Sequence, residues 1–180
     1  GMSSRTRIAG SPRQVRREVR RFDRRFTRGR WGAALAERFS EEQAVVMRAE
    51  FLEEYRRLVP EIPNIGGRRN PHQMGLKGAV QGLAVYRVVQ RHGGSVEDTG
   101  WLFHHWQRAE LERVPGRYPV PEQHQLARLH YLRGRIAEIR REPIEKQLQH
   151  FLYAFEIAPD RLTAIYTSRS LFALAGYAEG

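Results

Sequence analysis

Because this sequence has no cysteine, its seven histidines are the only strong nitrogen ligands that it offers to a metal. The lack of thiols excludes disulfides, thiolate zinc sites, iron–sulfur clusters and cysteine nucleophiles. A di-iron centre in a helical bundle requires Glu-x-x-His pairs, and no glutamate here has a histidine three residues later. Neither His104 with His105 nor His124 with His130 has the i, i+4 spacing that places two metal ligands on one helix face. We therefore expect no metal and no cofactor.

Arginine is concentrated at the start of the chain. Residues 1–30 hold eleven of the 31 basic side chains and only two of the 20 acidic ones, so the rest of the chain is nearly neutral. Clustered guanidinium groups neutralise phosphates, which favours contact with nucleic acid or with an anionic membrane surface. The alternative is a helix docked on the body with its arginines in water. The candidate phosphate-binding residues are Arg13, Arg16, Arg17, Arg20, Arg21, Arg24 and Arg25.

These arginines are predicted to lie on an amphipathic helix that Ser11 and Pro12 open and that ends near residue 27. Its apolar positions follow at spacings of four, three and four, which places them on one face. They are Val15, Val19, Phe22 and Phe26. A second helix is expected after Ser40, which forms a capping box with Gln43. Its apolar stripe consists of Ala44, Met47, Phe51, Tyr55 and Leu58.

The middle of the chain predicts a central, largely apolar helix between Asn70-Pro71 and Gly93-Gly94. Gly75, Gly78 and Gly82 lie on one side of it, where a neighbouring helix could approach closely. Ser95 with Asp98 repeats the capping signal and opens a helix that Pro115-Gly116 ends. The apolar residues on this helix include Trp101, Leu102, Trp106 and Ala109.

Two further helices are expected on either side of Pro143. The first follows Pro121, and we expect its inner edge to consist of Leu126, Leu129, Leu132 or Arg133, Ile136 and Ile139. The second carries Ile144, Leu148, Phe151, Leu152 and Phe155. For residues 160–175 the pattern favours a last helix over a hairpin in which the segment LTAIYT pairs with FLYAFEI.

These elements predict an all-α fold, with a single compact helical domain of six to seven helices and a basic N-terminal amphipathic helix. We divide the chain into a basic arm at 2–32 and a helical domain at 33–180. No stretch approaches the roughly 18 apolar residues of a membrane span. Together with the absence of cysteine, this predicts a cytoplasmic protein.

The helix start at Asn70 is the best candidate for a ligand site. Free N–H groups and the helix macrodipole at such a start can hold a carboxylate or a phosphate. Arg68 and Arg69 directly precede it, so we predict that Arg68, Arg69 and Asn70 bind a small carboxylate. The alternative is a capped core helix with two solvated arginines. Tyr86 lies about 24 Å further along the same helix and cannot share this site.

Within residues 61–100, several features occur together: Gly66-Gly67, Asn70-Pro71, a helix of small residues with Ala84, Tyr86 and Arg87, and a turn from Gly94 to Gly100. In these features the segment resembles part of the L-2-amino-thiazoline-4-carboxylic acid hydrolase family. The resemblance implies hydrolysis of a small cyclic amidine-like carboxylate to a ring-opened product. It also implies a C-terminal part with cysteines, whereas this sequence contains no cysteine.

The sequence leaves three functions open. The leading one is a helical protein that binds a small carboxylate, with or without the hydrolase activity that the resemblance implies. The second is a nucleic-acid-associated protein acting through the arginine-rich helix. The third is a protein–protein interaction module that forms a homo-oligomer through the glycine-faced helix or through exposed aromatic residues.

Overall fold

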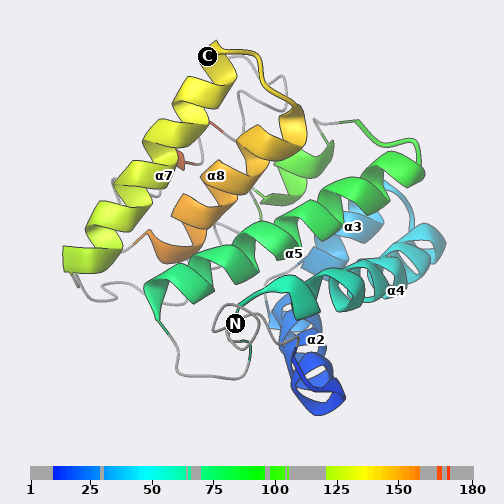
Figure 1. Cartoon of the computed structure of the whole chain (residues 1–180). Helices are drawn as coiled ribbons and strands as arrows, with labels where there is room; N and C mark the ends of the chain where they lie inside the picture. The colour runs from blue at the N-terminus through cyan, green and yellow to red at the C-terminus, as the bar shows by residue number, and fades with distance from the viewer. Residues whose placement is uncertain are drawn as a thin grey trace.

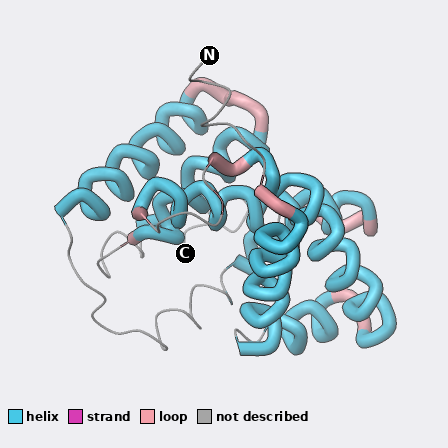
Figure 2. The backbone as a smooth tube through the Cα atoms, turned by 60° about the horizontal axis from the view of Figure 1, so that its bottom comes forward, coloured by secondary structure: helices cyan, strands magenta, loops and turns pink. Residues whose placement is uncertain are grey.

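A computed structural model describes residues 10–28, 31–63, 65, 70–95, 98–103, 105, 121–158, 166–167 and 170. Within these ranges the chain forms helices and no strand, which confirms the all-α prediction (Figure 2). The elements are α2 (Pro12–Arg28), α3 (Trp31–Arg38), α4 (Glu41–Leu58), the 3₁₀ helix η1 (Val59–Glu61), α5 (Pro71–Arg91), α7 (Pro121–Ile139) and α8 (Ile144–Ile157). Residues 98–103 are also helical. Helix α5 runs through the centre, with α8 and α7 on one side and α4, α3 and α2 on the other (Figure 1).

The helix boundaries follow local signals in the chain. Ser11 and Gln14 cap α2 reciprocally: Ser11 Oγ accepts from the Gln14 amide at 3.2 Å, and Gln14 Oε1 accepts from the Ser11 amide at 2.8 Å. The predicted caps at Ser40 and Asn70 are also present, as each side chain accepts from the amide three residues later. These starts are therefore set by residues adjacent in sequence.

The end of α5 is a Schellman turn. Gly93 has φ 75°, a left-handed conformation that favours glycine. The Gly94 amide donates to the Val89 carbonyl at 2.9 Å, and the Gly93 amide donates to the Gln90 carbonyl at 3.0 Å. Two of the orphan carbonyls of the last turn are thereby satisfied. The predicted stop at Gly93-Gly94 is confirmed.

The glycine side of α5 is where α8 packs. A Cβ atom added at Gly75, Gly78 or Gly82 would approach a side chain of α8 to 2.6, 2.5 or 2.0 Å. The residues met are, in order, Tyr153, Glu156 and Leu152. The predicted close approach of a neighbouring helix is therefore confirmed. Because α8 covers this face, it is not a free surface for a second copy of the chain.

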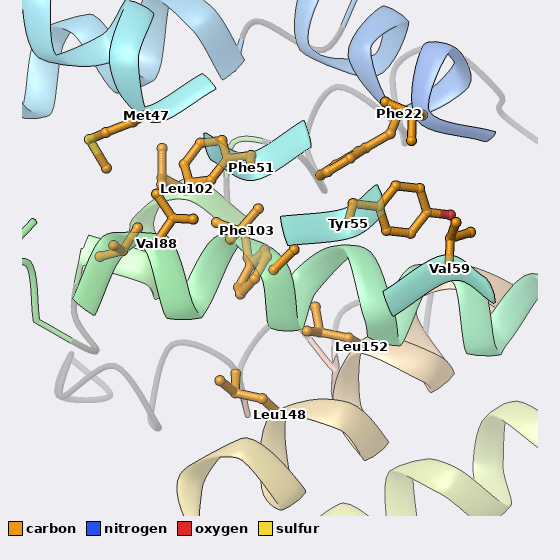
Figure 3. Close-up of a cluster of buried hydrophobic side chains, with 14 of the residues drawn as sticks. Phe22, Met47, Phe51, Tyr55, Val59, Val88, Leu102, Phe103, Leu148 and Leu152 are labelled. Carbon is orange, nitrogen blue, oxygen red and sulfur yellow. The ribbon is translucent and has the colours of Figure 1, made fainter. Parts of the chain in front are cut away.

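The main hydrophobic core joins α2 to the rest of the molecule. Phe22 of α2 is 1% exposed and makes an edge-on contact with Tyr55 of α4, with ring centroids 4.9 Å apart (Figure 3). Val15 and Val19 are buried in the same cluster, as their spacing predicted. The side chain of Phe26 lies outside the described residues. Helix α2 thus contributes directly to the core that α4, α5 and α8 share.

Helix α7 presents a different face to the core from the one the sequence predicted. Its large apolar side chains lie outside, with exposures of 42% for Leu129, 56% for Leu132, 47% for Ile136 and 75% for Ile139, and Arg133 is exposed too. The buried positions are instead the small residues Ala127, Gly134 and Ala137, while Leu126 is half-buried. A Cβ atom at Gly134 would lie 2.5 Å from the Phe151 ring. Leu126 packs against the core as expected, but the rest of the expected inner edge was wrong, because close packing against α8 selects small side chains.

The segment FLYAFEI, residues 151–157, lies within α8. It is therefore not available as a strand, and the hairpin alternative is excluded. Tyr166, Thr167 and Ser170 are helical, and the rest of 160–175 lies outside the described residues, as do Trp106, Ala109 and Pro115-Gly116. Among the described residues, none of the helices combines the length and apolar character needed to span a bilayer.

Candidate functional site

The predicted carboxylate site lies at the start of α5, where Asn70 is the N-cap residue. Its side-chain Oδ1 accepts a hydrogen bond from the Gln73 amide at 2.8 Å, and its backbone is extended. The side chain of Asn70 therefore holds the first turn of α5 in place. Arg68 and Arg69 lie outside the described residues.

Two residues beyond Asn70, His72 begins a group of polar side chains from three helices. Its Nδ1 lies 2.6 Å from the hydroxyl oxygen of Tyr153 on α8. His130 of α7 stacks on the same tyrosine, with ring centroids 3.6 Å apart and ring planes 18° from parallel. His130 Nδ1 is in turn 3.3 Å from His150 Nδ1 on α8. We call His72, His130, His150 and Tyr153 the histidine–tyrosine cluster.

Close helix packing positions the central member of this cluster. Tyr153 is 2% exposed, and its ring lies in a small core cluster with Ala79, Ala127 and Ile157. Gly75, one turn after His72, leaves the space that the ring occupies. Tyr153 is therefore held from the sides by apolar groups, and its hydroxyl reaches the exposed His72.

Two of the cluster's imidazoles are neutral at physiological pH. Burial lowers the pKa of His130 to about 4, and the charges that His150 and His72 carry when protonated, together with the charge of Arg133, act in the same direction. Burial, followed by the charges of Arg133 and Lys146, also lowers the pKa of His150. A neutral imidazole has one N–H donor and one lone pair. At 3.3 Å the Nδ1 atoms of His130 and His150 can share one hydrogen bond. The Nε2 atoms of the two rings can then bond to a ligand or water.

The cluster is not a metal centre of the usual kind. Within the part of the chain that the structure describes, no three histidine, aspartate or glutamate side chains converge on one point. His105 packs its ring against Trp101 at 4.4 Å, and His104 lies outside the described residues. The chemistry that the cluster offers is therefore hydrogen bonding and proton transfer by imidazole and phenol groups.

The seven candidate arginines of α2 fall into two groups. Arg25 is turned inward, where it donates to Gln81 Oε1 at 2.6 Å and to Glu156 Oε2 at 2.9 Å. Arg21 donates to Glu18 at 3.2 Å, and Lys77 of α5 contacts the same buried carboxylate at 2.9 Å. Arg21 and Arg25, two of the seven candidate phosphate-binding residues, are therefore engaged with acidic groups of the protein itself. They neutralise carboxylates within the fold.

The other five of the seven candidate arginines are exposed. Within the described part of the chain, none of them forms a hydrogen bond or an ion pair. They are Arg13, Arg16, Arg17, Arg20 and Arg24, and we call them the arginine stripe. The five arginines of the stripe are thus open to solvent, whereas Arg21 and Arg25 contact acidic groups of the protein itself.

A further charged group joins α4, α5 and α8. The buried carboxylate of Glu54 accepts hydrogen bonds from Arg91 and, at 3.5 Å, from Arg87, which also donates to Glu145 at 3.2 Å. Burial acts to raise the pKa of Glu54, but the hydrogen bond and charge of Arg91 and its neighbours outweigh it, so the pKa is lowered. Tyr86 is half-buried against the core, and burial followed by the charge of Glu145 raises its pKa. This group ties helices together at the far end of α5.

Sequence reasoning missed most of the histidine–tyrosine cluster. The sequence pairs His130 with His124 on the predicted helix after Pro121, and His72 and Tyr153 are 81 positions apart. The available signals were His72 directly after the predicted helix start, and His150 three residues before Tyr153 on one helix face. Comparison of the chain with protein-family models, with curated proteins and with solved structures found no match.

Proposed function

We propose that this protein binds a small carboxylate at the start of α5, between the first turn of that helix and the histidine–tyrosine cluster. The observation that carries the proposal is the 2.6 Å contact between His72 Nδ1 and the hydroxyl of the buried Tyr153. His72 lies two residues after the helix cap Asn70. The contact supports the proposal because it adds imidazole and phenol groups to a helix start that already favours anions. Arg68 and Arg69, directly before this start in the sequence, would supply the charge that a carboxylate needs.

The enzymatic form of this proposal is hydrolysis of a cyclic amidine-like carboxylate, as the resemblance of residues 61–100 implies. In that reaction water adds to the amidine carbon and gives a proton to a base. The ring C–N bond then breaks as its nitrogen takes up a proton. A neutral imidazole can accept the proton from water, and a second imidazole or a phenol can supply one to the nitrogen. The cluster contains groups for both roles.

A thermal-shift screen of small cyclic and amino carboxylates tests the binding proposal. Tyr153→Phe removes only the hydroxyl, and we expect it to weaken binding about 10-fold or more, because one hydrogen bond to a charged group is lost. Replacement of Arg68 and Arg69 together by alanine should weaken binding by a few kcal/mol if both contact the carboxylate. The matched control is Tyr86→Phe. Tyr86 lies on α5, about 24 Å along the helix from its start, so this variant should bind the carboxylate as the wild type does.

Two results would overturn the proposal. One is a wild-type protein that no carboxylate of the screen stabilises. The other is a Tyr153→Phe variant and an Arg68/Arg69 double variant that both respond as the wild type does. For a carboxylate that binds, NMR of the mixture over time distinguishes the binding protein, which leaves it intact, from the hydrolase, which opens its ring.

A further inference from the structure

The arginine stripe is a continuous charged surface of fixed geometry. At 3.6 residues per turn, positions 13, 16, 17, 20 and 24 fall within an arc of about 100° around the helix. They span about 16 Å along its axis at a rise of ~1.5 Å per residue. The opposite face of α2 is anchored, since Val15, Val19 and Phe22 are buried. Five arginines therefore project from one face of a helix that packs into the core.

The packing of α2 against the core favours nucleic acid over an anionic membrane as the partner of the arginine stripe. A helix that binds membranes inserts its apolar face among the lipid headgroups. The apolar face of α2 is used for the core of this protein, with Phe22 against Tyr55. The face that remains outside carries charge. This arrangement favours a partner recognised through phosphates alone over a lipid surface.

The spacing and rigidity of the stripe suit double-stranded DNA. Duplex DNA carries one phosphate for about every 1.7 Å of axis, so a row about 16 Å long can meet several phosphates at once. The major groove of B-DNA, about 12 Å wide, admits an α-helix, whereas the major groove of A-form RNA is too narrow for side chains to read. Arginine also binds phosphate through two parallel N–H donors.

We propose that the arginine stripe of α2 is a docking surface for the phosphate backbone of double-stranded DNA, independent of base sequence. Binding through five phosphate contacts predicts a slope of about −4.5 for log Kobs against log salt concentration. Affinity should therefore fall roughly 500-fold between 50 and 200 mM salt. This surface is distinct from the histidine–tyrosine cluster, so its test is separate from that of carboxylate binding.

The experiment measures binding of the full chain to a labelled DNA duplex over this salt range. The test variant is Arg13→Gln/Arg17→Gln/Arg20→Gln, which removes three stripe charges without touching the core. The matched control, Arg128→Gln/Arg133→Gln/Arg140→Gln, removes three exposed arginines on or next to α7. The slope of log Kobs against log salt concentration should be shallower by about 2.7 in the test variant, because each phosphate contact contributes about 0.9. The control should keep the wild-type slope, and both should melt close to the wild type.

Four results would overturn the proposal. The first is no binding of the duplex by the wild type at 50 mM salt. The second is an equal loss in the two triple variants, which would assign binding to net charge alone. The third is tighter binding to an RNA duplex of the same length than to DNA. The fourth is co-sedimentation with anionic vesicles in the absence of DNA binding, which would assign the stripe to a membrane.

Discussion

The ring of Tyr153 lies against the bare Cα of Gly75, and the two residues fit together as a pair. A Cβ atom at Gly75 would be 2.6 Å from Cζ of the ring and 2.7 Å from each Cε atom. The ring is buried and its hydroxyl contacts His72 Nδ1, so it has little room to move aside. This contact sets the distance between α5 and α8 and holds the phenol at the centre of the histidine–tyrosine cluster.

Gly75→Ala should therefore destabilise the protein. The added methyl group must push against a rigid ring, and such overpacking costs about 1–3 kcal/mol in the free energy of unfolding. The matched control is Gly32→Ala in α3, where an added Cβ meets nothing within 4 Å. That change should be neutral or slightly stabilising, because alanine favours helix over glycine. Urea unfolding of both variants measures the difference, and equal stability would contradict the contact.

His130 should make the protein less stable in mild acid. Its pKa falls from about 6.5 when unfolded to about 4 when folded, first because of burial and then because of nearby positive charges. Below pH 6.5 the unfolded chain therefore binds a proton that the folded chain does not, and stability is lost as the pH falls towards 4. The contribution is roughly 1–3 kcal/mol.

The measurement is the free energy of unfolding of the wild type and of His130→Gln at several pH values from 7 to 4. Buried carboxylates such as Glu54, whose pKa is lowered in the fold, also make the protein less stable in acid, but this effect is present in both proteins. The wild type should lose more stability than His130→Gln over this range. Parallel curves for the two proteins would mean that His130 titrates as a solvated histidine does.

Arg25 and Arg20 should differ in what their removal costs, although they lie five residues apart on α2. Arg25→Ala leaves Glu156 and Gln81 without the guanidinium group that they contact, at a cost of about 2 kcal/mol. Arg20→Ala removes an exposed side chain and should change stability by no more than about 0.5 kcal/mol. Denaturant unfolding of the two variants checks this division, and an equal effect would refute it.

Helix α7 offers a direct check of which face is buried. Leu132→Gln places an amide at a position that is 56% exposed, and stability should change by less than about 1 kcal/mol. Ala137→Gln forces a longer polar side chain into a position that is 1% exposed, and should cost about 2–3 kcal/mol or prevent folding. If Leu132→Gln were the more damaging of the two, the sequence-based inner edge of α7 would be restored.

The amino-acid sequence by itself determined most helix boundaries among the described residues and the charge of the N-terminal segment, but its pattern did not predict α3 (Trp31–Arg38). Ser11, Ser40 and Asn70 cap their helices as predicted, and Gly93 with Gly94 ends α5. These features depend on groups within about five residues of one another, so local hydrogen bonds and backbone preferences decide them. The glycine side of α5 was visible for the same reason, since helical spacing alone places its members together.

Only the tertiary structure decided which side chains meet and which faces are covered. Tyr153 reaches His72 because α8 packs on the glycine side of α5, and no local rule relates two positions so far apart. Burial of Ala137 in place of Leu132 depends on how closely α7 approaches α8, which apolar spacing does not specify. The division of the α2 arginines likewise depends on the buried carboxylate of Glu18 and the half-buried carboxylate of Glu156, which need a positive partner. Packing distance and charge burial are properties of the assembled helices, and the linear pattern does not contain them.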